Sequence, residues 1–231
     1  MFEQPDLYNA DCMDGMKEFP DNFFDLAIVD PPYGGANSDA EGGGTARHYT
    51  FGLRKKDKGY EDRRNMGREI CKKINAWDIA PKEEYFKELF RVSRNQIIWG
   101  GNYFDLPPTR CFLIWRKLSI SENFSMAMAE YAWTSFNSNA KVFEFAPQGK
   151  KEDQRFHPTQ KPIELYQWCL SNYAKKGDKI LDTHVGSASS LIACHNAGLE
   201  AWGFEIDGQY YEKAKQRLQR AKEQVTMFEL I

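Results

Sequence analysis

The four residues Asp30-Pro31-Pro32-Tyr33 combine an acid, two prolines and an aromatic ring in one short loop. They follow the apolar run 26–29, which is typical of a buried parallel strand. Two consecutive prolines remove backbone donors and restrict φ, so the turn is rigid and its carbonyl oxygens can accept hydrogen bonds. The Asp30 carboxylate adds an acceptor and Tyr33 a flat surface, so the loop could bind a planar molecule through both hydrogens of an exocyclic amino group. The alternative is a strand that simply ends at the prolines, with Tyr33 packed inward.

A second group of polar residues lies where another predicted strand turns into a helix. Asp182 ends the strand, and Glu205 ends the next strand, 23 residues later. A carboxylate at that second strand end can hold the two hydroxyls of a ribose. The loop after Asp182 would bring a ligand close to the backbone and to the helix N-terminus, and its candidate contact residues are Gly186, Ser187 and Ser189. Because neither G-x-G-x-x-G nor G-x-x-x-x-G-K-[ST] occurs, the pattern indicates a nucleoside ligand without phosphates.

A third motif, His157-Pro158-Thr159-Gln160-Lys161-Pro162, stands directly before a predicted helix. Thr159 and Lys161 could reach a carboxylate group on a ligand. The alternative is a polar loop in which Pro162 simply occupies the first helical position.

Predicted strands and helices alternate along the chain. The strands are expected at 6–9, 25–29, 95–99, 111–115, 130–134, 141–145, 179–181 and 201–204, and the helices at 13–19, 82–92, 162–174, 187–196 and 207–224. Alternation of this kind predicts an α/β fold with a doubly wound, mostly parallel sheet and helices on both faces. We expect an antiparallel hairpin at one edge, formed by 130–134 and 141–145.

Composition limits the classes of protein to which the chain can belong. Its 231 residues suffice for a single domain, 1–231, and 42% hydrophobic with 28% charged residues is ordinary for a globular protein. No apolar stretch approaches the roughly 20 residues that span a bilayer, and the N-terminus lacks the pattern of a signal peptide. The five cysteines show no C-x-x-C spacing, which argues against a disulfide framework or a zinc site. We therefore expect a cytoplasmic protein without a metal.

Charge is distributed unevenly, although the formal net charge is only −2. Ten basic and four acidic residues fall between Arg47 and Lys73, so this segment carries +6 and the remainder −8. Residues 34–75 are glycine-rich and then basic, and we expect them to form a mobile insertion. A local basic face suits a protein that meets phosphates on one side, and a solvated loop is the alternative.

Taken together, the three motifs in this order resemble the S-adenosylmethionine-dependent amino-methyltransferases of DNA, beta group, whose motif order is circularly permuted. The resemblance implies a Rossmann-like methyltransferase fold, S-adenosyl-L-methionine as cofactor and double-stranded DNA as partner. Asp-Pro-Pro-Tyr is more typical of adenine-N6 enzymes, so the implied reaction is direct in-line methylation of adenine N6 after base flipping. Cytosine-N4 or RNA-adenine methylation remains an alternative, as does an inactive nucleic-acid-binding protein. A dehydrogenase is disfavoured because the glycine fingerprint is missing.

The resemblance assigns roles residue by residue. Asp30 and the Pro31 carbonyl would accept hydrogen bonds from the target amino group, Pro32 would complete the rigid turn, and Tyr33 would stack on the flipped base. The residues placed around the cofactor are Asp11, Cys12, His157, Thr159, Lys161, Asp182, His184, Gly186, Ser187, Ser189, Glu205 and Ile206. In that set Glu205 would bind the ribose, Asp11 would lie beside the adenine, and Thr159 and Lys161 would lie near the carboxylate.

The cofactor loop departs from the family pattern at two informative positions. The usual Asp-Pro-Phe-x-Gly-Ser-Gly-Thr is here Asp-Thr-His-Val-Gly-Ser-Ala-Ser, so His184 replaces an aromatic and Ala188 replaces a glycine. The acid, the first glycine and the serine remain, so we expect cofactor binding to survive.

The resemblance places DNA recognition in a short region, 103–156. Its candidate contact residues are Arg110, Arg116, Lys117, Asn123, Lys141, Gln148, Lys150, Lys151 and Arg155. Because so small a region covers little of a duplex site, we expect a homodimer.

Overall fold

The computed structural model describes residues 2–34, 58–59, 61–62, 65, 78–121, 127–147 and 155–228. The chain divides into two compact units, Met1–Pro31 with Glu83–Ile231, and Pro32–Lys82. The predicted insertion 34–75 falls wholly in the second unit, and most of it lies outside the described residues, so its mobility and its basic face stay predictions. Within that unit the backbone N–H of Gly34 donates to Asp78 Oδ1 at 3.0 Å.

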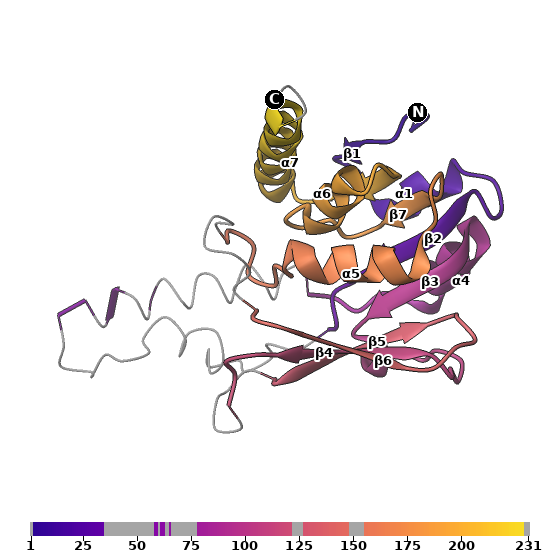
Figure 1. Cartoon of the computed structure of the whole chain (residues 1–231), viewed down its shortest axis with the longest axis horizontal. Helices are drawn as coiled ribbons and strands as arrows, with labels where there is room; N and C mark the ends of the chain where they lie inside the picture. The colour runs from indigo at the N-terminus through magenta and orange to yellow at the C-terminus, as the bar shows by residue number, and fades with distance from the viewer. Residues whose placement is uncertain are drawn as a thin grey trace. The chain divides into compact units, whose positions relative to one another are not determined.

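In the first unit, the described strands form one mixed sheet (Figure 1). In chain order they are β1 (Leu7–Tyr8), β2 (Phe24–Val29), β3 (Ser93–Trp99), β4 (Phe112–Lys117), β5 (Ala129–Thr134), β6 (Lys141–Phe145), β7 (Lys179–Asp182) and β8 (Glu200–Phe204). Their order across the sheet is β1-β8-β7-β2-β3-β5-β4-β6. The five strands from β1 to β3 are parallel, whereas β5 runs antiparallel to both β3 and β4. The α/β fold with a mostly parallel sheet is therefore confirmed, and its antiparallel strand, β5, lies inside the sheet rather than at the edge.

The pairing predicted between 130–134 and 141–145 is wrong. Strand β4 lies between β5 and β6, and β6 pairs with β4 in parallel. Burial explains the order, because β4 buries Leu113 and Trp115 whereas every residue of β6 is at least partly exposed. The more apolar strand occupies the interior position, and the more polar one forms the edge.

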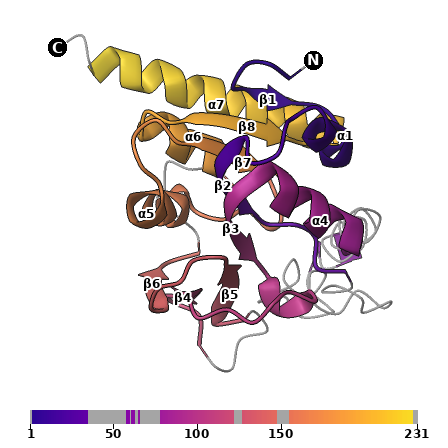
Figure 2. The same ribbon diagram turned by 90° about the vertical axis from the view of Figure 1, so that its right-hand side faces the viewer.

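Helices cover both faces of the sheet (Figure 2). They are α1 (Cys12–Lys17), α4 (Glu83–Val92), α5 (Ile163–Tyr173), α6 (Ser189–Asn196) and α7 (Gly208–Phe228), with a short 3₁₀ helix η1 (Gly101–Tyr103). Helices α1 and α4 pack over one face, and α5 and α6 over the other. The face that α4 buries carries Tyr85, Phe86, Leu89 and Val92, the helical spacing that predicted it. None of the described helices is long and apolar enough to cross a bilayer.

The direction in which the chain winds changes between β7 and β2, which are neighbours in the sheet. From β7 the chain crosses through α6 to β8 on one side, and from β2 it crosses through α4 to β3 on the other. In open α/β sheets, ligands bind outside the carboxyl ends of the strands at such a switch point. Asp182 ends β7 and Asp30 directly follows β2, so the two carboxylates predicted to be functional lie at this point.

Candidate functional site

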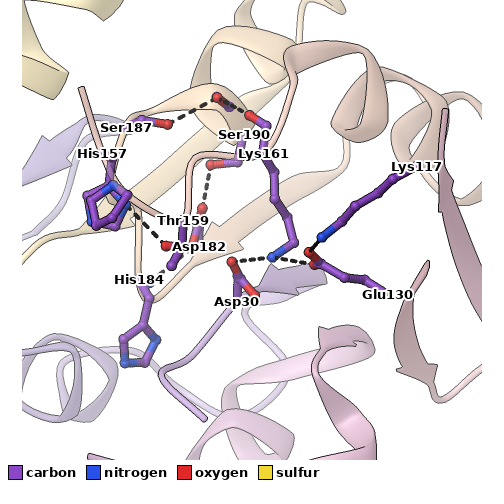
Figure 3. A network of polar contacts seen from close by, with 12 residues as sticks. Asp30, Lys117, Glu130, His157, Thr159, Lys161, Asp182, His184, Ser187 and Ser190 are labelled. Atoms are coloured by element: carbon purple, nitrogen blue, oxygen red, sulfur yellow. Dashed lines mark hydrogen bonds and ion pairs between the residues drawn. The ribbon is translucent and has the colours of Figure 1, made fainter. Parts of the chain in front are cut away.

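The carboxylate of Asp30, which follows β2, belongs to a cluster of four charges that alternate in sign (Figure 3). Lys161 Nζ lies 2.5 Å from Asp30 Oδ2 and 3.1 Å from Glu130 Oε2, the latter as an ion pair without hydrogen-bond alignment. Glu130 Oε1 in turn lies 2.5 Å from Lys117 Nζ. The role of Lys161 near a cofactor carboxylate stays a prediction, and in the structure its ammonium contacts Asp30. The first and third sequence motifs therefore meet here through the contact between Lys161 and Asp30, which the motifs alone did not predict.

Two groups of this cluster, Lys161 and Glu130, have pKa values shifted by their neighbours. Burial alone would lower the pKa of Lys161, but the carboxylates of Asp30 and Glu130 outweigh it and raise that pKa above its usual range. Burial would raise the pKa of Glu130, but the ammonium groups of Lys161 and Lys117 lower it. Lys161 and Glu130 are consequently both charged at neutral pH.

Asp182 fixes the loop that joins β7 to α6. Its Oδ1 accepts a hydrogen bond from the backbone N–H of His184 at 3.0 Å, and its Oδ2 accepts one from the Ser190 hydroxyl. Burial raises the pKa of Asp182 to about 7, although both hydrogen bonds favour the ionised form. In this structure the carboxylate holds the loop against the first turn of α6.

Glu205 braces the same loop from the end of β8. Its Oε2 accepts the backbone N–H of Gly186 at 2.8 Å, and its Oε1 accepts that of Asp207 at 2.8 Å. The side chain of Asn9, directly after β1, donates to the Glu205 carbonyl at 2.7 Å and also supports this strand end. Ile206, the next residue, is 67% exposed and offers an apolar surface beside the carboxylate.

Two residues of the loop have left-handed backbone conformations. Gly186 has φ +55°, and a Cβ there would lie 3.3 Å from the His157 ring, so glycine is the residue that fits without displacement. Ala188 has φ +65°, which costs about 1–2 kcal/mol for a residue with a Cβ. The same conformation ends the loop, so α6 begins at Ser189 rather than at the predicted residue 187. It also explains why the family pattern has glycine at this position.

The long helix α7 and the third motif hold the loop from outside. Arg217 of α7 donates to the Ser187 carbonyl at 2.6 Å and to the Ser189 hydroxyl at 3.0 Å. The Ser189 hydroxyl donates to the Lys161 carbonyl at 2.8 Å, which joins the second and third motifs directly. Arg217 lies outside the three sequence motifs, and the sequence indicated only that it belongs to a helix.

His157 packs edge-on against Tyr210 with 4.4 Å between ring centroids, and its Nδ1 lies 3.2 Å from the Thr159 hydroxyl. Burial lowers the pKa of His157 to about 4. The predicted contact residues Gly186 and His157 therefore do lie together, with Thr159 beside them.

The predicted adenine-side residues lie at the start of α1. Asp11 caps the helix, accepting the backbone N–H of Met13 at 2.8 Å. Burial, with the neighbouring Asp11 carboxylate, raises the pKa of Cys12 to about 12, so the thiol is not a nucleophile at neutral pH. Pro32 and Tyr33 belong to the second unit, so the predicted stacking role of Tyr33 stays a prediction.

Several site residues carried no motif. Tyr85 of α4 shares a 2.6 Å hydrogen bond with the Thr183 hydroxyl, which lies 2.9 Å from His184 Nδ1. Glu130 was likewise not singled out, and Lys117 was named only as a candidate DNA contact. One signal was available for Lys117, because it follows Leu113 and Trp115 in the buried alternation of its strand. A charge in the buried phase of a strand predicts a buried partner.

The predicted DNA-recognition region 103–156 is described only in part. Asn123, Gln148, Lys150 and Lys151 lie outside the described residues. The described candidates already contact protein groups: Arg110 donates to Asn139, Arg116 pairs with Glu144, Lys117 with Glu130, Lys141 donates to Asn172 and Arg155 to Pro147. Of these, Lys117 is buried, which argues against a DNA-contact role for it.

His184 should make the fold sensitive to acid. Burial lowers its pKa to about 4, below the ~6.5 of an unfolded chain. Its contribution to stability is therefore present above pH ~6.5 and is lost as the pH falls through 4, because the unfolded chain then binds the proton more tightly. We expect His184→Phe to lose about 2–3 kcal/mol less free energy of unfolding than the wild type between pH 7 and pH 4. Urea denaturation at both pH values measures this, and identical losses in the two proteins would contradict it.

Comparisons with known proteins agree with this arrangement. Residues 72–216 match the family N6_N4_Mtase, described as DNA methylase. The type II methyltransferase M2.MboI of Moraxella bovis is 24% identical over an alignment of 248 positions that covers 91% of this chain and 86% of that protein.

Two solved structures share the fold. The M1.HpyAVI–SAM complex aligns with a TM-score of 0.50 at 19% identity, over 91% of this chain and 98% of that one. The PvuII DNA methyltransferase (cytosine-N4-specific) aligns with a TM-score of 0.57 at 10% identity, over 97% of this chain and 93% of that one. The family match spans more than half of the chain and confirms the resemblance found in its motifs: the chain belongs to the DNA methylase family N6_N4_Mtase.

Proposed function

We propose that this DNA methylase transfers the methyl group of S-adenosyl-L-methionine to the N6 amino group of adenine in double-stranded DNA. The observation that carries the proposal is the placement of Asp30. Its carboxylate follows β2 at the switch point of the sheet, with the cofactor loop after the neighbouring strand β7. An acceptor for the target amine and a loop for a nucleoside cofactor thus stand on adjacent strands.

The residues at the ends of β7 and β8 suit the proposed cofactor. Each Glu205 oxygen accepts one backbone N–H, and a carboxylate oxygen has acceptor capacity for a second donor. A ribose diol supplies two such donors, and exposed Ile206 beside it suits the face of an adenine ring. When bound, S-adenosylmethionine would supply an electrophilic methyl group on a sulfonium.

Asp30 and the Pro31 carbonyl would accept hydrogen bonds from the amino group to be methylated. The N6 lone pair of adenine is delocalised into the ring, so the amine is a weak nucleophile. Two acceptors that hold both hydrogens favour a more tetrahedral nitrogen with its lone pair directed at the methyl group. In direct in-line transfer the N–C bond would form as the sulfonium S–C bond breaks, and the methylated nitrogen would then release one proton to solvent. This step depends on positioning and on acceptors placed where positive charge develops on nitrogen.

The target base would have to leave the duplex to reach Asp30, at a cost of a few kcal/mol. In this proposal Tyr33 stacks on the extruded base and offsets part of that cost, at about 1–3 kcal/mol. A homodimer would let the short region 103–156 cover both halves of a duplex site.

Identifying the methylated nucleoside tests the proposed base. We would incubate the chain with methyl-labelled S-adenosylmethionine and unmethylated genomic DNA, digest the DNA to nucleosides and separate them. We expect label in N6-methyldeoxyadenosine. Label in N4-methyldeoxycytidine would keep the mechanism and correct the base, since cytosine also presents an exocyclic amine. Cofactor binding without any labelled nucleoside would instead favour an RNA substrate or an inactive binding protein.

A further inference from the structure

Between strand β4 and the loop that begins at Asp30, four charges form a continuous chain (Figure 3). It runs from Lys117 through Glu130 and Lys161 to Asp30, with N–O distances of 2.5, 3.1 and 2.5 Å. The side chains of Lys117 and Lys161 are only 7% and 4% exposed, and those of Glu130 and Asp30 are 22% and 14% exposed. The four residues come from three strand regions and from the loop before α5.

Stability alone does not account for such a chain. Removing charges from water is expensive, and well-packed apolar residues often stabilise a protein as well or better. One lysine between two carboxylates would leave a net negative charge, and Lys117 brings the formal charge of the group to zero. The number and order of the charges therefore suit a role in holding the Lys161 ammonium against Asp30.

Lys161 also connects the two halves of the proposed reaction site. Its carbonyl oxygen accepts a hydrogen bond from Ser189, whose hydroxyl also accepts one from Arg217. Its ammonium meanwhile contacts Asp30. The four-carbon side chain of a lysine is flexible, so the ammonium needs a second contact besides Asp30 to stay in one position.

We propose that Glu130, itself held by Lys117, is a positioning residue that anchors the Lys161 ammonium and thereby orients the Asp30 carboxylate toward the amino group to be methylated. This inference rests on the proposed function of Asp30. Glu130 contacts neither substrate nor cofactor in this account and acts through Lys161.

The test compares Glu130→Gln with the wild type in single-turnover methyl transfer. We expect a 10- to 100-fold slower step with S-adenosylmethionine affinity and DNA affinity within about threefold, since only orientation is disturbed. The matched control is Glu88→Gln on α4. Glu88 has a similar 19% exposure and pairs with Arg91 away from the site, so its substitution should leave the rate unchanged.

The pH profile separates positioning from a merely structural role. The titratable groups around the Lys161 ammonium are Asp30 after β2, Glu130 of β5, Tyr166 of α5 and His157 of its own loop, with Lys117 of β4 behind Glu130. Loss of the Glu130 charge lowers the pKa of Lys161, so Glu130→Gln should lose activity at an alkaline pH where the wild type does not. NMR titration of the Lys161 side chain should show the same downward shift, by about one unit or more.

Lys117→Met is the second variant, in case Glu130→Gln unfolds. It removes the other partner of Glu130 and should slow the same step, but by less. A folded Glu130→Gln with a wild-type rate and pH profile would overturn the inference. If the wild type itself transfers no methyl group, the proposed function fails, and an unshifted NMR titration would then separately overturn the anchoring of Lys161 by Glu130.

Discussion

The variant Asp30→Ala should transfer methyl groups at least about 10³-fold more slowly than the wild type, while its affinity for S-adenosylmethionine stays within about threefold. The carboxylate follows β2 and, in the proposed mechanism, accepts a hydrogen of the target amine. Without it the lone pair stays in the ring, and no other acidic group among the proposed catalytic residues replaces it. Cofactor affinity should persist because Asp30 is not among the proposed cofactor contacts, and Asp182 and Glu205 at the ends of β7 and β8 remain in place.

Single-turnover rates and a cofactor titration measure the two halves of that prediction separately. Asp21→Ala is a suitable control, because Asp21 is also an acid paired with a cation, Arg91, but precedes β2 at the opposite end of the strand. A rate within tenfold of the wild type in folded Asp30→Ala would rule out Asp30 as the essential acceptor.

The variant Lys161→Met should lose about 3–5 kcal/mol of unfolding free energy. It leaves two largely buried carboxylates, Asp30 and Glu130, facing each other without the cation between them. The methionine stem keeps most of the packing of lysine, so the loss reports mainly the unpaired charges.

Lys87→Met provides the control for Lys161→Met. Lys87 pairs with Glu83 at 2.7 Å, but both side chains are well exposed, and solvent screening makes the contribution of such pairs to stability small. Guanidinium chloride denaturation of both variants measures the difference. A loss below about 1 kcal/mol for Lys161→Met would mean that the carboxylates do not depend on Lys161.

Local patterns were sufficient to predict most of the fold and the position of each motif within it. The strand before Asp30 and the unit formed by β7, the cofactor loop and α6 combine apolar runs with turn residues inside one short window. The motifs then lie at the same end of the sheet, because the carboxyl ends of parallel strands point the same way.

The parts that the sequence did not predict depend on contacts between distant segments. Nothing within 130–145 indicates that β4 lies between β5 and β6, since strand order is decided by which strand buries more apolar surface. Likewise, the contact of Lys161 with Asp30 joins residues 131 positions apart. The motif pattern placed Lys161 near the cofactor, and only the three-dimensional arrangement shows that its ammonium contacts Asp30.

The most direct test of the central claim is methyl transfer to DNA itself, measured for the wild type and for Asp30→Ala in parallel. Purified chain would be incubated with methyl-labelled S-adenosylmethionine and unmethylated double-stranded DNA, and acid-precipitable label would be counted after DNase, RNase or protease treatment. The account predicts label that only DNase releases, in the wild-type reaction alone. Label that RNase or protease releases, or equal label in the DNA with Asp30→Ala, would contradict it.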